Sequence, residues 1–271
     1  MGLTKRRLGR TGMMVTELGL GAMDTPQSEY GYETLNVALK SGINFIDTAR
    51  DYIGSEYLIG KVISNMRSLD LHISTKTFSR SRDGCQHDVD KSLKIIGVDT
   101  IDIYKLHDVS TQKEYEQDLH PLGGLEGLEI AKYRGLIRHI GISSHNLDIL
   151  DQAITSGRFD TVMVEYSAFF CSSSELISKA RQYDVGIIVM RPLGGSGRMS
   201  TIRSRVANGI EGSLSPSNLL RYVLSNQDIS VVIPGARFPS RVEENVAVAL
   251  SYKPLNDAEM SDCEMDARLL Y

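Results

Sequence analysis

Residues 72–107 read HISTKTFSRSRDGCQHDVDKSLKIIGVDTIDIYKLH, and the rest of the fold can be inferred from this unit. Residues 72–77 and 101–107 are short runs with β-branched residues, which is typical of strands. Between them, residues 86–96 are amphipathic and are followed by Gly97, which suits the left-handed position after a helix. The stretch is therefore predicted to be a strand, a crossover helix and a second, parallel strand.

The same unit repeats along the whole chain. Further strands are predicted at residues 17–23, 44–49, 139–144, 161–166, 186–193 and 230–235. Further helices are predicted at residues 30–40, 55–65, 122–133, 147–155, 173–183, 216–226 and 239–250. Eight strands alternating with eight helices, without a Pro/Ser/Gly-rich linker, favour a closed (β/α)8 TIM barrel over an open sheet. We expect an α/β protein in which residues 1–271 form a single domain.

Two segments interrupt this alternation. Residues 8–14, LGRTGMM, are predicted to form an N-terminal β-hairpin that closes the bottom of the barrel. Residues 194–212 are glycine-rich and basic, and we interpret them as a long loop after the seventh strand. That position is on the barrel face where active sites lie, so the loop is predicted to be functional.

Composition excludes several classes of protein. With 41% hydrophobic and 24% charged residues and a formal net charge of -4, the chain lacks the basic field of a nucleic-acid-binding protein. No apolar run approaches the ~18 residues of a membrane span. The three cysteines form no CxxC pair, which fits a reducing cytosol. We expect a cytoplasmic protein, monomeric or a small homo-oligomer, that binds neither nucleic acid nor membranes.

Reactive side chains follow three consecutive strands. Asp47 ends the second strand with Tyr52 just beyond it, Lys76 ends the third, and His107 ends the fourth. Taken singly, these residues are ordinary: a helix cap, a packed ring, a solvated amine or a core histidine. Because the carboxyl ends of barrel strands converge on one face, we expect all four in one cavity. We call this set the tetrad.

The tetrad has a chemical use. An ammonium group beside a phenol favours the phenolate, so Lys76 is predicted to lower the pKa of Tyr52 from its ordinary value near ~10. Asp47 would keep Lys76 charged despite burial. His107 would orient a carbonyl oxygen by a hydrogen bond. The pattern predicts a general acid positioned over a carbonyl group.

The motifs around these residues resemble those of the aldo-keto reductase superfamily. In chain order they are RLGRTG (7–12), LGLGAM (18–23), NFIDTA (44–49), STK (74–76), YKLH (104–107), GISS (141–144), VMRPLGG (189–195) and IPGAR (233–237). The resemblance implies a barrel that binds a nicotinamide dinucleotide without a Rossmann domain, and the chain has no GxGxxG between a strand and a helix. It also implies that the tetrad is catalytic: hydride passes from nicotinamide to the carbonyl carbon while Tyr52 protonates the oxygen.

The resemblance also implies the cofactor contacts. Ser143, Ser144 and Met163 would approach the carboxamide, although many members have Asn and Gln at the last two positions. Met190 stands where many members stack an aromatic ring on the nicotinamide. The expected contacts are Gly21, Ala22, Met23, Asp47, Ser143, Ser144, Met163, Met190, Arg191, Pro192, Leu193, Gly195, Arg198, Gly235, Ala236, Arg237, Arg241, Glu244 and Asn245.

The phosphorylated form of the cofactor is favoured by one arginine. The resemblance implies that Arg241 occupies the position that grips the 2′-phosphate, and arginine suits phosphate through paired hydrogen bonds. Glu244 and Asn245 would reach the adenine. Gly235-Ala236 departs from the Lys-Ser of many NADP-dependent relatives. We expect NADP(H) in preference to NAD(H).

The substrate is expected to be a small aldehyde or ketone. The resemblance assigns its pocket to loops near the strand ends and to the C-terminal tail, which is short and acidic here. Besides the tetrad's Tyr52 and His107, the pocket residues are expected to be Met23, Asp24, Asp108 and Phe169.

Three other functions fit parts of the sequence. Lys76 could form a Schiff base in a barrel lyase, but Asp47 would keep its amine protonated. A metal-dependent hydrolase is disfavoured because none of the six histidines forms HxH or HExxH, so we expect no metal. The resemblance also covers NADP-binding β subunits of potassium channels, so a cofactor sensor with little turnover remains an alternative.

Overall fold

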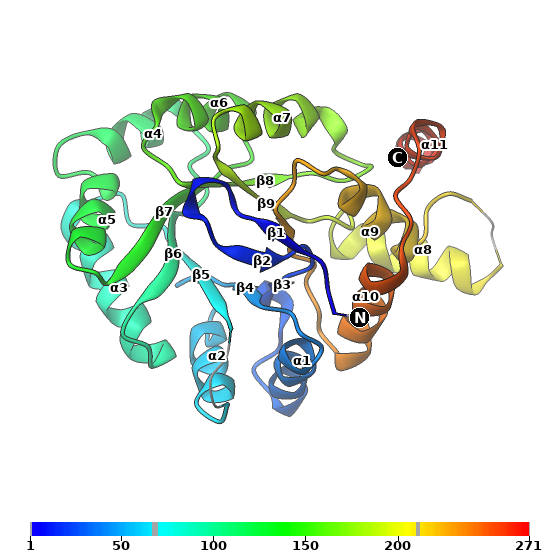
Figure 1. The fold of residues 1–271 in the computed structure, drawn as a ribbon, viewed down its shortest axis with the longest axis horizontal. Coiled ribbons are helices and arrows are strands. Elements are labelled where there is room, and N and C mark those ends of the chain that lie inside the picture. The colour runs from blue at the N-terminus through cyan, green and yellow to red at the C-terminus, as the bar shows by residue number, and fades with distance from the viewer. Residues whose placement is uncertain (1, 67–69, 210–211, 271) are drawn as a thin grey trace.

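Eight parallel strands form a ring in the computed structural model, which describes residues 2–66, 70–209 and 212–270 (Figure 1). They run in chain order around the sheet: β3 (Leu20–Gly21), β4 (Phe45–Asp47), β5 (His72–Thr77), β6 (Ile101–Leu106), β7 (Ile137–Ser143), β8 (Thr161–Glu165), β9 (Gly186–Met190) and β10 (Val231–Val232). The predicted (β/α)8 barrel is confirmed.

The ring closes between its first and last strands. Parallel bridges join Leu18 to Val232 and Gly21 to Gly235. The amide of Gly19 donates to the carbonyl of Val232 at 2.8 Å, so hydrogen bonding continues beyond the two short strands. Closure leaves no long unpaired edge and directs all eight carboxyl ends to one face.

The helices cover the outside of the ring. Eight of those described follow the eight strands in turn: α1 (Glu29–Lys40), α2 (Ser55–Ile63), α3 (Arg82–Ile96), α5 (Gly124–Tyr133), α6 (Leu147–Ser156), α7 (Ser174–Gln182), α9 (Pro216–Ser225) and α10 (Pro239–Ser251). α3 shows the local signals: Ser81 accepts the amide of Gly84 at its start, and Gly97 ends it with φ 79°.

The N-terminal hairpin closes the bottom of the barrel, as predicted. β1 (Lys5–Arg7) pairs antiparallel with β2 (Met14–Thr16) around a 3-10 turn at Gly9–Thr11. In Figure 1 the hairpin lies across the ring of strands. Its buried Leu8 and Val15 pack on Phe45, Ile103 and other side chains that fill the barrel interior.

The prediction of one long loop at residues 194–212 is wrong. Helix α8 (Ser196–Ala207) occupies most of it, while residues 210–211 lie outside the described residues. Two glycines at its start, Gly194 and Gly195, have φ of 80° and 90° and give the turn that a helix needs, although they resemble a loop signal in the sequence.

Two more helices were not predicted. α4 (Gln112–Leu119) begins with a capping box of Thr111 and Glu114, and α11 (Asp257–Leu269) with one of Asn256 and Glu259. Both are so polar that apolar periodicity is weak, so the sequence of α11 resembles an acidic tail rather than a helix. Within the described ranges, no helix is long and apolar enough to cross a membrane.

Candidate active site

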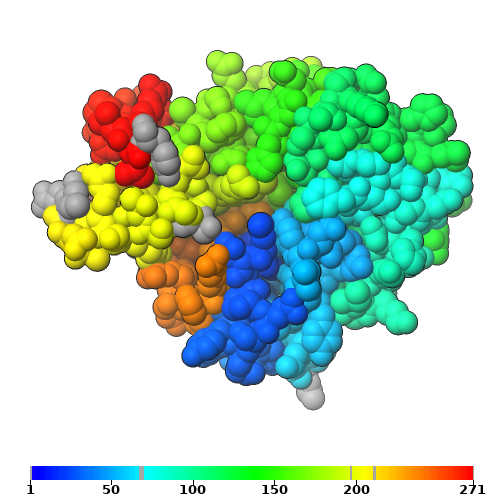
Figure 2. All heavy atoms as spheres, turned by 180° about the vertical axis from the view of Figure 1, so that it is seen from behind, coloured from blue at the N-terminus to red at the C-terminus, as the bar shows by residue number. Residues whose placement is uncertain are grey.

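The carboxyl ends of the strands surround a cavity of about 690 Å³. Figure 2 shows this face, opposite the hairpin, hollowed between segments from the first strands, the β9–α8 turn and the last strand. The volume lies in the range of pockets that hold a small-molecule ligand or cofactor. Every member of the tetrad lines the cavity.

Asp47, at the end of β4, is the centre of a buried charge cluster. Lys76 of β5 donates to its Oδ2 at 2.6 Å, and Lys105 of β6 donates to its Oδ1 at 2.6 Å. All three side chains are almost completely enclosed. Burial alone would raise the pKa of Asp47, but the two ammonium groups outweigh it and hold that pKa below its ordinary value. Asp47 is therefore ionised.

Tyr52 lies in the turn between β4 and α2, and its ring is close to Lys76. The Nζ of Lys76 is 4.7 Å from the ring centroid. Burial raises the pKa of Tyr52, and although Lys76 lowers it, the net result is a pKa above the ordinary value. The expectation of a lowered pKa is therefore wrong, because desolvation of the phenolate outweighs the single ammonium. The phenol is protonated at neutral pH, as a proton donor must be.

His107, just after β6, completes the group. Phe78 stacks on its ring at 4.0 Å between centroids, and Tyr52 meets it edge-on at 5.7 Å. Burial and the nearby Lys76 lower the pKa of His107 to about 3, so the imidazole is neutral. Its buried Nδ1 has no hydrogen-bond partner among the described residues. His107 lines the cavity, and a neutral imidazole there can form a hydrogen bond with a ligand oxygen.

The turn that carries Tyr52 is held by a buried network. Arg50 forms an ion pair with Glu56 at 2.5 Å, and its amide donates to the carbonyl of Lys76 at 3.0 Å. Glu56 also accepts hydrogen bonds from Thr75 at 2.8 Å and Ser92 at 2.7 Å. These contacts join the turn to β5 and α3, so the phenol has a fixed position.

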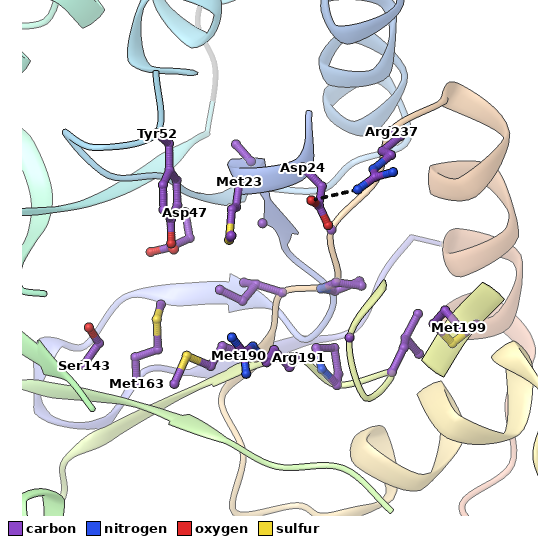
Figure 3. Close-up of a pocket in the computed structure, with 18 of the residues that line it drawn as sticks. Met23, Asp24, Asp47, Tyr52, Ser143, Met163, Met190, Arg191, Met199 and Arg237 are labelled. Carbon is purple, nitrogen blue, oxygen red and sulfur yellow. Dashed lines mark ion pairs between the residues drawn. The ribbon is translucent and has the colours of Figure 1, made fainter. Parts of the chain in front are cut away.

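Most of the predicted cofactor and substrate residues line the same cavity. Figure 3 shows Tyr52 and Asp47 on one side, with Met163 and Met190 across from them. Outside the tetrad, the predicted residues in the lining are Gly21, Ala22, Met23, Asp24, Asp108, Ser143, Ser144, Met163, Met190, Arg191, Pro192, Leu193, Gly195, Gly235, Arg237, Arg241 and Asn245.

Four predicted contacts are not part of this lining: Arg198, Ala236, Glu244 and Phe169. Ala236 is buried. The guanidinium of Arg198 lies 5.2 Å from the ring centroid of Phe169. Glu244 forms ion pairs with two arginines: its Oε2 is 2.7 Å from Nη2 of Arg203, and its Oε1 is 2.5 Å from Nη1 of Arg241.

The far end of the cavity is suited to anions. The first turn of α8 has no side-chain cap, so its amides are available beside Gly195, which lines the cavity. Arg203 of α8 and Arg241 of α10 also line it. Arg237 lies 3.5 Å from Asp24 across the mouth, the pair joined by a dashed line in Figure 3. An elongated ligand with phosphate groups fits these residues, with its uncharged end near the tetrad.

Lys105 is a site residue that the strand-end pattern does not single out. The sequence indicates it through the alternation of side chains along a strand: positions 103, 105 and 107 lie on the same side, and Ile103 packs in the barrel interior. The cavity also includes Asp51, whose Oδ2 is 3.8 Å from His107 Nδ1, and Phe78. Both stand in loops, where a sequence gives no periodicity to interpret.

The comparisons with known proteins agree with this geometry. A family model described as the aldo/keto reductase family matches residues 17–265. L-galactose dehydrogenase of Arabidopsis thaliana is 28% identical and covers 97% of this chain and 93% of its own length. An NADH-specific methylglyoxal reductase of Escherichia coli is 24% identical, and the match covers 95% of this chain and 96% of that protein. The holo form of an aldo-keto reductase from Bacillus halodurans has a similar fold, with TM-score 0.80, 24% identity and coverage of 97% and 96%.

Proposed function

Because the chain belongs to the aldo/keto reductase family, we propose that it reduces an aldehyde or ketone to an alcohol with hydride from NADPH. The observation that carries this proposal is the contact between Lys76 and Tyr52, 4.7 Å from Nζ to ring centroid, at the end of the cavity. A phenol beside a fixed ammonium can release its proton to a nascent alkoxide, because the resulting phenolate is stabilised.

Each residue of the tetrad has a separate role in this reaction. Bound nicotinamide supplies the hydride. The neutral imidazole of His107 donates a hydrogen bond to the carbonyl oxygen and fixes its direction. Tyr52 then gives its proton to that oxygen, and Lys76 stabilises the phenolate that remains. Asp47 keeps Lys76 charged and in place.

The preference for NADPH rests on the cationic end of the cavity. Arg203, Arg237 and Arg241 all line it, and a 2′-phosphate would bring two negative charges among them. Glu244 opposes this preference, because it already pairs with two of the three arginines. The relative from Escherichia coli is described as NADH-specific, so both cofactors belong in the test.

The deciding experiment follows hydride from the cofactor into the product. NADPH or NADH deuterated at the reactive C4 position is incubated with the protein and a panel of aldehydes, ketones and sugars. We expect many turnovers per molecule and deuterium on the carbinol carbon. Tight NADPH binding with at most one oxidation per molecule would instead support a cofactor sensor and contradict the proposed enzyme.

A further inference from the structure

Lys105 lies opposite Lys76 in the pairing of β5 with β6, and both lysines donate to the same carboxylate. Lys76 binds one oxygen of Asp47 and Lys105 the other, each at 2.6 Å. Lys105 also donates to the hydroxyl of Ser74 and is fully enclosed. Neither substrate nor cofactor can touch it, so it influences the reaction only through its neighbours: through Asp47, which it contacts, and through its charge near His107.

The packing of the barrel interior leaves space for the side chain of Lys105. Gly141 of β7 is the register partner of Lys105, and a Cβ at this glycine would lie 2.8 Å from the Cγ of Lys105. The same Cβ would lie 2.4 Å from the Oγ1 of Thr161. The absence of a side chain at Gly141 therefore makes room for the stem of Lys105.

The charges in this cluster do not cancel. One carboxylate and two ammonium groups give a net charge of about +1, whereas Lys76 with Asp47 alone would be neutral. A neutral ion pair stabilises a neighbouring phenolate much less than a net cation does. Lys105, on the far side of Asp47, thus makes the net charge beside Tyr52 positive instead of neutral.

We propose that Lys105 is a positioning residue for the reduction: it neutralises Asp47, so that the charge of Lys76 acts undiminished on Tyr52. The inference rests on the proposed function, because it concerns the proton donor of that reaction. It adds a fifth buried group to the tetrad, acting from the far side of the carboxylate.

The groups that face this cluster set its pH dependence. Asp47 comes from β4, Lys76 from β5 and His107 from the residue after β6, while β7 and β8 contribute the uncharged Gly141 and Thr161. Burial and Lys76 lower the pKa of Lys105, while Asp47 raises it, and the balance is about 8. Lys105 is therefore charged below about pH 8 and loses its charge above it, and reductive turnover should fall through that range.

The test compares Lys105→Met, Lys76→Met and the double variant with Lys91→Met, an exposed lysine on α3. We expect Lys105→Met to lower kcat by about 10–100-fold and abolish the inflection near pH 8, with KM and NADPH affinity within about threefold. In the Lys76→Met background, Lys105→Met leaves Asp47 without an ammonium partner, so the effects of the two substitutions on kcat and on stability should be non-additive, and additive effects would contradict a shared carboxylate. A folded Lys105→Met enzyme with unchanged kcat, or with lower kcat and the inflection retained, would overturn the inference.

Two further measurements apply if Lys105→Met does not fold or if the protein reduces no carbonyl compound. If Lys105→Met does not fold, Lys105→Arg should move the inflection to higher pH, and an unmoved inflection contradicts the proposal. If no carbonyl is reduced, the proposed function fails, but the ¹³Cε resonance of Lys105 can still be followed. It should titrate near pH 8 and at higher pH in Lys76→Met, where a like charge is gone. A midpoint unaffected by Lys76→Met would refute the shared cluster.

Discussion

Lys76 and Tyr52 come from different strand units but meet at one point, with the ammonium nitrogen 4.7 Å from the phenol centroid. Lys76 is fixed by Asp47 and by the carbonyl of Thr48 at 2.7 Å, and Tyr52 by the buried turn between β4 and α2. Because burial keeps the phenol protonated, the ammonium matters most after the proton has left.

Lys76→Met should fold and bind cofactor but turn over slowly. Asp47 keeps its contact with Lys105, so the substitution leaves no unpaired buried carboxylate. Loss of the ammonium beside Tyr52 should lower kcat by about 10²–10⁴-fold. Steady-state kinetics and NADPH titration measure both effects, with exposed Lys94→Met as control. Unchanged kcat in Lys76→Met would remove this residue from proton donation.

Cofactor preference should depend on the arginines around Glu244. Arg241→Ala should weaken NADPH by about tenfold, or roughly 1.4 kcal/mol, and NADH by less than twofold. Glu244→Gln should tighten NADPH, because it releases Arg203 and Arg241 from a competing carboxylate.

The matched control for these variants lies on α8. Arg203→Ala should behave like Arg241→Ala, whereas Arg205→Ala, exposed on the same helix and outside the cavity lining, should have no effect. Binding is measured by titration with each dinucleotide. Equal losses of NADPH and NADH affinity in Arg241→Ala would refute the assignment of the 2′-phosphate.

Borohydride treatment with a carbonyl substrate should leave no adduct on either buried lysine. Lys76 and Lys105 both donate to ionised Asp47, and a protonated amine does not attack a carbonyl. Intact-mass and peptide mass spectrometry would detect the reduced Schiff base. An adduct at Lys76 would instead establish a lyase-type intermediate.

Asp160, at the bottom of the barrel, should make the free energy of unfolding depend on pH in the acid range. Burial would raise its pKa, but His139, Lys132 and the amide of Ile140 outweigh this and lower it below the ordinary 3.8. A lowered carboxyl pKa stabilises the fold above about pH 4, and this contribution is lost as the pH falls further.

Urea unfolding of Asp160→Asn tests this directly. We expect a loss of about 1–3 kcal/mol at pH 7 that shrinks as the pH falls below about 4, because the unfolded chain then binds a proton that the folded Asp160 still excludes. Asp90→Asn, exposed on α3, serves as the control. A difference that is constant between pH 7 and pH 3 would contradict the role of the charge.

Much of the fold could be predicted because the barrel repeats one signal. All eight strands overlap the predicted ranges, although β3 and β10 are much shorter than residues 17–23 and 230–235, because pairing where the ring closes continues only as isolated bridges. α4 and α11 were missed because capping boxes, rather than an apolar face, mark where they begin, and α8 was missed because Gly194 and Gly195 before it resemble a loop signal.

The site could be predicted in part for a similar reason. Strand ends converge, so Asp47, Lys76 and His107 could be placed together from order alone. The sign of the pKa shift of Tyr52 could not, because it is a balance of burial against charge that only the packed cavity defines. Lys105 was missed because buried lysines are rare, and the default interpretation is a solvent-exposed amine.

The most direct test of proton donation is NADPH oxidation by Tyr52→Phe beside the wild type. Phenylalanine keeps the ring against His107 and removes only the hydroxyl. We predict that kcat falls by at least about 100-fold while NADPH affinity stays within about twofold. Turnover in Tyr52→Phe equal to that of the wild type would show that the proton comes from another group, and the account would be wrong.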